Sequence, residues 1–154
     1  MKERINGKIE ELLSAEEFND LDEIVKLGEK ATRGLVNILS KESDPLMRKR
    51  AAIALGRIRD KKAIEPLVNR LMDKDPTVLI SIIDALALMG QKSYSDKIIP
   101  FLDNPDASVR GHAAKALGVI KARNAKKAIE GLLRKEEYEF VRKEANDALK
   151  KLGY

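Results

Sequence analysis

Apolar positions recur along this chain at helical spacing, in stretches that resemble one another. The clearest stretch runs from Asp44 to Asp60 (DPLMRKRAAIALGRIRD), and related stretches begin at Asp75, Asn104 and Tyr138. Equivalent positions are separated by 31, 31 and 32 residues. The apolar stripe of the first copy is Met47, Ala51, Leu55 and Ile58. Because such a unit cannot bury its apolar face alone, the repetition predicts copies stacked into a solenoid.

Cap residues indicate where the repeated helices begin. Asp44-Pro45 opens the first copy, and the pair returns as Asp75-Pro76 and as Asn104-Pro105. Asp and Asn accept hydrogen bonds from unpaired N–H groups at a helix start, and proline at the first helical position loses no bond. We therefore expect each pair to start a helix.

Small residues fall at matching places inside the copies. Ala51-Ala52 corresponds to Ala113-Ala114, and Gly56 corresponds to Gly118. Glycine costs about 1 kcal/mol in a helix relative to alanine, so we interpret these positions as sites of close helix approach.

The remaining segments supply the partner helix of each copy. One partner helix carries Pro66 within its apolar pattern, where we expect a kink. In the last copy Asn146 and Lys150 replace the second Ala and the Gly, as a polar terminal repeat requires. We predict one all-α domain, a right-handed superhelix of about five helix pairs. Its segments are a degenerate first repeat (1–28), repeats at 29–59, 60–90 and 91–121, and a capping repeat (122–154).

The motif Asp-Pro-x-x-Arg-x-x-Ala-Ala-x-Ala-Leu-Gly-x-Ile, followed by Asp-x-x-Ala-Ile-x-Pro-Leu, resembles the HEAT-like repeat named after phycobilisome lyases. Residues 44–74 match it best and 104–133 match it well. The resemblance implies that the second helix of each pair lines a concave face. It also implies that the motif's arginine pairs with acidic residues along the stack. That arginine is Arg48, Arg110 and Arg142, whereas the second copy has Leu79.

The resemblance assigns the partner-binding surface to variable positions of the second helices. In the third and fourth copies these positions are Ser108, Gly111, His112, Lys115, Phe140, Lys143, Glu144 and Asp147. In the first two copies we predict an apolar centre of Leu46, Ile53, Ile80 and Leu88. We predict a charged rim of Lys49, Arg50, Arg57 and Lys115, with Asp84 and His112 completing the site. An apolar centre with a charged rim is typical of protein interfaces. The alternative is that the apolar second copy, which includes Leu79, Ile82 and Ile83, simply packs into the core.

Charge is unevenly distributed along the chain. Residues 1–45 contain seven Lys or Arg and 11 Asp or Glu, whereas residues 46–154 contain 23 and 14. Basic residues cluster after the second helices at Arg57, Arg59, Lys61 and Lys62, and again at Lys121, Arg123, Lys126 and Lys127. One interpretation is a basic edge that follows a nucleic-acid backbone. The other is compensation of helix dipoles, which favour cations at helix C-termini. Three Tyr, three Phe and no Trp provide little for base stacking.

The chain has no cysteine and a single histidine, His112. A catalytic metal site usually needs several ligands, commonly including two or three His. We therefore predict no catalytic residue, cofactor or metal, and a non-enzymatic scaffold that binds another protein. Nucleic-acid binding is one alternative, and the resemblance makes a lyase-like accessory subunit another. No apolar run approaches ~18 residues, which predicts no membrane span. We expect a cytoplasmic protein, since the lack of cysteine fits a reducing compartment, and the Lys- and Glu-rich composition is compatible with a thermophilic source.

Overall fold

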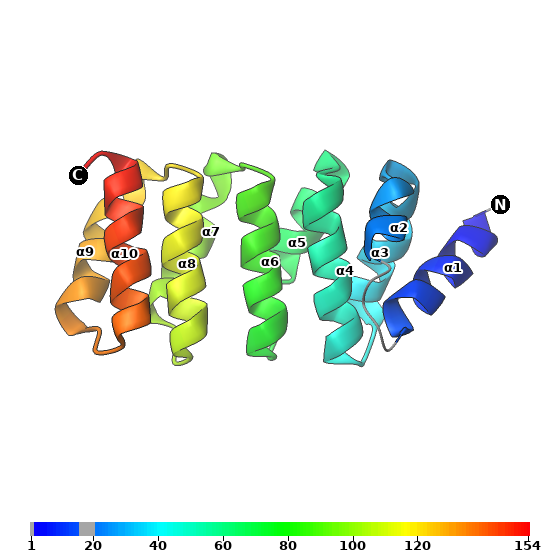
Figure 1. Cartoon of the computed structure of the whole chain (residues 1–154), viewed down its shortest axis with the longest axis horizontal. Helices are drawn as coiled ribbons and strands as arrows, with labels where there is room; N and C mark the ends of the chain where they lie inside the picture. Colours follow the sequence, from blue (N-terminus) through cyan, green and yellow to red (C-terminus); the bar gives the residue numbers. More distant parts are fainter. Residues whose placement is uncertain (1, 16–20) are drawn as a thin grey trace. The chain divides into compact units, whose positions relative to one another are not determined.

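A computed structural model describes residues 2–15 and 21–154, and within them the chain is all-helical with no strand (Figure 1). Met1 and residues 16–20 of the predicted first repeat lie outside this range. The α-helices are α1 (Lys2–Ser14), α2 (Leu21–Lys26), α3 (Glu29–Lys41), α4 (Pro45–Ile58), α5 (Ile64–Asn69), α6 (Pro76–Leu88), α7 (Ser95–Ile98), α8 (Ala107–Val119), α9 (Lys126–Lys135) and α10 (Glu139–Leu152). Short 3-10 helices are η2 (Lys61–Ala63), η3 (Lys92–Tyr94), η4 (Ile99–Asp103) and η5 (Arg123–Ala125). The all-α prediction is confirmed.

The chain divides into two compact units, Met1–Ala85 and Leu86–Tyr154, which we call unit 1 and unit 2. Each unit has its own apolar core. Fully buried side chains in unit 1 include Leu13, Leu35, Leu39, Leu55 and Leu67. In unit 2 they include Ile98, Val109, Leu117, Ile129 and Val141.

Side-chain caps start α4, α6 and α8, with one change from the prediction. The carboxylate of Asp44 accepts the Leu46 N–H at 2.9 Å, and that of Asp75 accepts the Thr77 N–H at 2.8 Å. The Asn104-Pro105 pair does not start α8, so that prediction was wrong. Asp106 is the N-cap of α8, and Asn104 accepts the Asp106 N–H at 2.9 Å. The Asn side chain forms a local turn before the helix begins.

Pro66 also differs from its predicted role. The helix that contains it, α5, has six residues and follows the 3-10 helix η2. Pro66 is the third residue of α5, where its missing N–H would have had no helical partner. The chain therefore accommodates this proline in the first turn of a short helix rather than by a kink.

The two repeat glycines permit the close helix approach that the sequence predicts. A Cβ on Gly56 of α4 would lie 2.7 Å from Ala85 Cα of α6, within unit 1. A Cβ on Gly118 of α8 would lie 2.7 Å from Ala148 Cα of α10, within unit 2. Since real Cβ atoms do not approach backbone so closely, a side chain at either position would push the helices apart.

A left-handed residue follows each second helix at the repeat spacing. The four residues are Arg59, Gly90, Lys121 and Gly153, with φ between 54° and 91°. Glycine adopts this conformation freely, whereas a residue with a Cβ adopts it at a cost of about 1 kcal/mol. Two of the four turns therefore carry a basic residue where glycine would be less strained.

An ion pair clamps neighbouring repeats together in unit 1. Arg48 Nε and Nη2 donate to the two carboxylate oxygens of Asp73 at 2.9 and 3.0 Å. Arg48 Nη1 donates to the carbonyls of Glu42 and Ser43, and Arg70 also donates to Asp73. Burial opposes ionisation of Asp73, but these donors and the Asp75 N–H outweigh it and hold the pKa of Asp73 below its usual range.

Unit 2 contains an equivalent clamp. Arg110 Nε and Nη2 donate to the carboxylate of Glu136 at 2.7 and 3.0 Å, and Nη1 donates to the carbonyls of Asn104 and Pro105. The Arg110 guanidinium outweighs the effect of burial and lowers the pKa of Glu136. The predicted pairing with acidic residues is thus present for Arg48 and Arg110, whereas Arg142 donates to the backbone carbonyls of Leu133 and Glu136.

Candidate functional site

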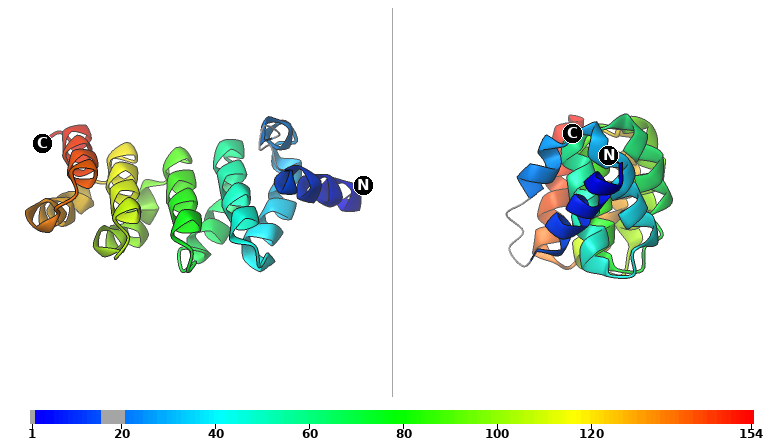
Figure 2. Two further views of the ribbon diagram at one scale, coloured as in Figure 1. Left: turned by 60° about the horizontal axis from the view of Figure 1, so that its bottom comes forward. Right: turned by 90° about the vertical axis from the view of Figure 1, so that its right-hand side faces the viewer.

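The candidate site is a groove between α8 and α10 in unit 2. These two helices lie side by side in both Figure 1 and Figure 2. The groove has a volume of about 240 Å³, and we call it the α8–α10 groove. It is lined by Ser108, Gly111, His112, Lys115, Phe140 and Glu144.

The repeat pattern explains why a groove forms here. Gly111 is buried in α8, and a Cβ built on it would lie 3.5 Å from Cε2 of Phe140. That distance is an ordinary van der Waals contact, so the Phe140 ring packs against α8 at Gly111 and forms the floor of the groove, while about half of its surface stays exposed. His112 and Lys115 of α8 and Glu144 of α10 supply polar groups along the two walls.

Phe140 forms a pair with a second exposed aromatic ring. The centroids of Tyr138 and Phe140 are 6.0 Å apart, with the ring planes tilted by 55°. Tyr138 is 57% exposed and Phe140 49% exposed, so a considerable aromatic area faces solvent beside the groove. Aromatic pairs in this geometry attract each other beyond their burial, and exposed aromatic side chains are common anchors of protein interfaces.

The clamp of unit 2 positions this aromatic pair. Glu136 Oε1, which accepts from Arg110, also accepts the Tyr138 N–H at 3.1 Å. The Arg110 guanidinium lies over the Tyr138 ring at 5.9 Å from its centroid, a cation–π contact. One buried ion pair therefore fixes both the backbone and the ring of Tyr138 at the start of α10.

These groups are suited to binding rather than to an enclosed reaction. Pockets that bury a drug-sized ligand usually have volumes of roughly 300–1,000 Å³, so this groove is small for one. It combines an exposed aromatic floor with polar walls of both charges, which is the anatomy of a protein interface. Among the described residues no group of three or more His, Asp or Glu side chains could hold a metal ion.

Unit 2 contains three of the predicted site residues. His112 and Lys115 line the α8–α10 groove, together with Phe140 and Glu144, which the family resemblance had assigned to the same surface. Leu88 is the last residue of α6 and is 47% exposed.

The other predicted residues lie in unit 1, on α4 and α6. They are Leu46, Lys49, Arg50, Ile53 and Arg57 on α4, and Ile80 and Asp84 on α6. Leu46 is 47% exposed, whereas Ile53 and Ile80 are partly buried. Since the predicted set is divided between the two units, a single patch formed by all of it stays a prediction.

Two of the predicted rim arginines contact the N-terminal helices. Arg50 Nη1 donates to the carbonyls of Leu13 and Ala15, at 2.5 and 2.9 Å, at the end of α1. Arg57 forms an ion pair with Asp22 of α2 at 2.6 Å. These side chains hold unit 1 together, which the sequence pattern did not indicate.

Leu79, Ile82 and Ile83 of the apolar second copy are buried. This agrees with the alternative that they belong to the core.

The sequence reasoning also missed Tyr138, which has no equivalent aromatic in the earlier copies. Its position two residues before Phe140, at the start of the last second helix, was the available signal.

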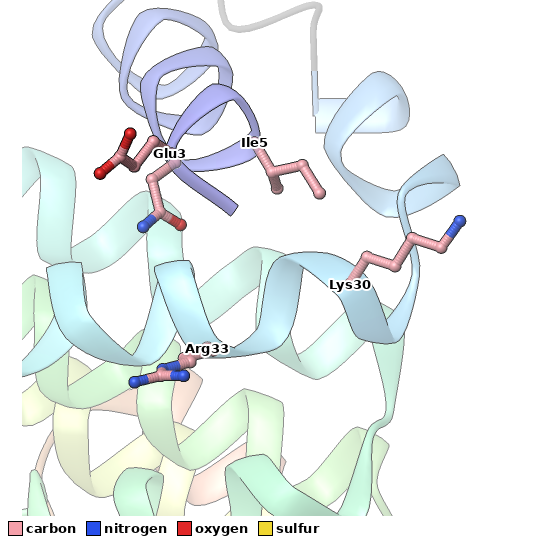
Figure 3. A pocket seen from close by; sticks show the side chains of 5 residues that line it. Glu3, Ile5, Lys30 and Arg33 are labelled. Carbon is pink, nitrogen blue, oxygen red and sulfur yellow. The ribbon is translucent and has the colours of Figure 1, made fainter. Parts of the chain in front are cut away.

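Another cleft, of about 290 Å³, lies between α1 and α3 in unit 1 (Figure 3). It is lined by Glu3, Ile5, Asn6, Lys30 and Arg33. Figure 3 shows that the side chains of Lys30 and Arg33 extend in different directions. Because its charged groups do not converge, we do not treat this cleft as the functional site.

A family model and one curated protein match this chain in sequence. A family model described as HEAT repeats matches residues 32–97 and 95–154. The bilin biosynthesis protein PecE of Mastigocladus laminosus is 33% identical over 90 residues, which cover 58% of this chain and 34% of PecE. The chain thus spans about a third of the length of that relative.

Two solved structures share the fold. One is in the complex of CpcE and CpcF of phycocyanin lyase from Nostoc sp. PCC7120, with a TM-score of 0.74 and 21% identity over 99% of this chain and 65% of that one. Human deoxyhypusine hydroxylase matches with a TM-score of 0.64 and 19% identity over 98% of this chain and 64% of that one. At these identities the likeness concerns the fold alone.

The similarity to PecE, a bilin biosynthesis protein, contradicts our expectation that the protein is not an enzyme. That expectation rested on missing catalytic motifs. Each catalytic motif is specific to one class of enzyme. The absence of the familiar motifs therefore does not exclude other enzymatic activities. No helix in the described ranges is long and apolar enough to cross a membrane, and the predicted cytoplasmic location stays a prediction.

Proposed function

The chain belongs to the HEAT-repeat family, and we propose that it is a subunit of a lyase-type assembly that acts on a bilin. In this proposal the chain holds a protein partner in the α8–α10 groove. The observation that carries the proposal is the groove itself, with its exposed Tyr138–Phe140 pair and polar walls. The relation to a bilin rests on the similarity to PecE, a bilin biosynthesis protein.

The physical features of the site support binding of a partner here. The Phe140 ring is half exposed and already held at its base, so little side-chain entropy is lost when a partner covers it. The clamp fixes Tyr138 beforehand in the same way. Lys115 and Glu144 on opposite walls offer both charges to a partner and so favour one orientation of binding. The complex of CpcE with CpcF is a precedent for this fold in an assembly with another protein.

Photocrosslinking tests the proposal. A photoreactive phenylalanine analogue replaces Ser108 in the groove in one variant and Arg134 on α9 in a matched control, both at exposed positions. We expect a discrete protein to crosslink from the native lysate at position 108 and not at position 134. We also expect Phe140→Ala to reduce the yield at position 108.

The bilin part of the proposal has its own measurement. The crosslinked protein is purified and its covalently bound bilin is quantified by absorbance, after incubation with bilin in the presence and absence of this chain. We expect attachment or removal of bilin to depend on the chain. A partner whose bilin content never changes would contradict the lyase-type role, and equal crosslinking at both positions would contradict the groove.

A further inference from the structure

Six basic residues gather at one end of unit 2. They lie just after α8, in η5, in the first turn of α9 and in the last turn of α10, and we call them the lysine edge. Its residues are Lys121, Arg123, Lys126, Lys127, Lys150 and Lys151. In Figure 1 the C-terminal ends of α8 and α10 lie at the same edge of this unit.

Contacts confirm that these segments meet. Lys151 Cδ would lie 3.5 Å from a Cβ on Gly118, which places the end of α10 against the end of α8. Lys126 Nζ lies 3.6 Å from the centroid of the Tyr154 ring, which brings the last residue of the chain to the start of α9. The lysine edge is therefore one surface, although its residues come from two stretches of sequence.

Little negative charge is available to neutralise this surface. Lys126 is 3.9 Å from Glu130, and Lys150 is 3.7 Å from Asp147. Lys121, Arg123, Lys127 and Lys151 form no ion pair with any residue in the described part of unit 2. Residues 86–154 contain 14 Lys or Arg and nine Asp or Glu, whereas residues 1–85 contain 16 of each. The net positive charge of the chain thus belongs to unit 2.

Helix dipoles do not explain the whole cluster. A cation in the last helical turn compensates the dipole, and Lys150 and Lys151 already occupy that turn in α10. Lys121 instead stands at the left-handed position with φ 54°, where the equivalent residues of two other repeats are Gly90 and Gly153. A basic residue stands here although glycine would be less strained, and the same is true of Arg59 in unit 1. Residues with a strained backbone are often found at functional sites.

We infer that the lysine edge docks an acidic segment of a protein partner, a conclusion that rests on the proposed function. Five of the six residues are lysines, whose ammonium groups pair with carboxylates as point charges. Tyr154 is 56% exposed, and Lys126 Nζ lies over its ring. Val119, two residues before Lys121, is 45% exposed, and an exposed apolar side chain suits a protein surface better than a phosphate backbone.

The experiment uses fluorescein-labelled poly-L-glutamate as the acidic probe and follows binding by anisotropy. The edge variant is Lys121→Gln, Arg123→Gln and Lys127→Gln. The control variant, Lys97→Gln, Arg134→Gln and Lys135→Gln, removes the same charge from other exposed positions of unit 2. We expect the edge variant to weaken binding by about tenfold and the control by less than about threefold, since three ion pairs at a surface act together modestly. Binding of the wild type should also weaken as salt is raised.

Two results would overturn the inference. Equal losses in both variants would mean that net charge alone attracts the probe. Displacement of the probe by duplex DNA at a lower charge concentration than by unlabelled poly-L-glutamate would identify nucleic acid as the ligand. The groove variant Phe140→Ala should bind poly-L-glutamate like the wild type. Failure of the edge can therefore be distinguished from failure of the partner-binding groove, which is tested by crosslinking.

Discussion

The two arginine clamps share a geometry but differ in what surrounds them. In unit 1 Asp73 accepts from both Arg48 and Arg70, and its side chain is 1% exposed. In unit 2 Glu136 pairs with Arg110, which also lies over the Tyr138 ring. The same repeat element thus stabilises packing in unit 1, whereas in unit 2 it also positions the aromatic pair beside the α8–α10 groove.

The second copy of the repeat lacks both residues of the clamp. It has Leu79 in place of the motif arginine, and the residue equivalent to Asp73 and Glu136 is Asn104. Asn104 keeps the local role of that position, since it accepts the Asp106 N–H as Asp73 accepts the Asp75 N–H. The turn is therefore retained where arginine and carboxylate are both absent, which shows that the turn and the clamp are separable.

Removing the arginine of a clamp should lower the stability of the fold more than the other changes below. The loss should be larger in unit 2 than in unit 1. Arg110→Met leaves Glu136 buried without its partner, which typically costs roughly 3–5 kcal/mol. Arg48→Met leaves Asp73 paired with Arg70. We therefore expect a smaller destabilisation, that of losing hydrogen bonds to a charged group, about 1.5–3 kcal/mol. Urea denaturation followed by circular dichroism measures both variants. Equal losses would show that Arg70 contributes nothing to the unit 1 clamp.

Adding a methyl group at the close helix contacts should affect both units alike. Gly56→Ala and Gly118→Ala place a Cβ within 3 Å of backbone atoms, and we expect each to destabilise the fold by about 1–3 kcal/mol. Gly131→Ala in α9 is the matched control, because its Cβ would meet nothing within 4 Å. We expect Gly131→Ala to stabilise the protein by up to about 1 kcal/mol. A gain of stability in Gly118→Ala would contradict the tight packing of α8 on α10.

Acid should weaken both clamps. The folded protein lowers the pKa of Asp73 and of Glu136, so the clamps stabilise it above the usual carboxyl pKa. This contribution is lost as the pH falls through the lowered pKa values. Urea midpoints measured from pH 7 to pH 3 should therefore fall more in the wild type than in Arg110→Met, which has already lost one clamp. If the urea midpoints of the two proteins fell in parallel, Glu136 would not contribute to the pH dependence of stability.

Loss of the aromatic floor should change stability least. Phe140 is half exposed, so Phe140→Ala removes little buried area, and we expect less than about 1.5 kcal/mol of destabilisation. Thermal unfolding monitored by circular dichroism checks this expectation. A large loss of stability would mean that Phe140 belongs to the core of unit 2, and binding data on the variant could then not be attributed to the groove.

The periodic features of the fold could be predicted from the sequence because they recur. The apolar stripe and the close approach at Gly56 and Gly118 follow from equivalent positions in several copies. The pairing of Arg48 and Arg110 with acidic residues was implied by the family resemblance. The helix start at Asp106 was missed, because Asn104-Pro105 and Asp106 are both plausible caps and the choice depends on turn geometry.

The candidate site was less predictable, because surface residues do not follow the period. His112, Lys115, Phe140 and Glu144 could be placed on one surface from their repeat positions, and the structure brings them to one groove. The contribution of Tyr138 depends on Arg110 and Glu136, which come from different repeats. Likewise Arg50 contacts carbonyl groups more than 30 residues earlier in the chain, a pairing that no local pattern encodes.

The central claim is that the α8–α10 groove binds a protein partner. Its most direct test uses the partner that photocrosslinking identifies, as free protein. Calorimetry measures the affinity of this partner for the wild type, Phe140→Ala and Met72→Ala. Met72 is the matched control because it is 80% exposed and lies in unit 1, outside the α8–α10 groove. Truncation of an aromatic anchor typically costs about 2 kcal/mol or more, so we predict that Phe140→Ala weakens binding at least tenfold. Met72→Ala should bind like the wild type. Unchanged affinity in Phe140→Ala, or an equal loss in both variants, would contradict the assignment of the groove as the partner site.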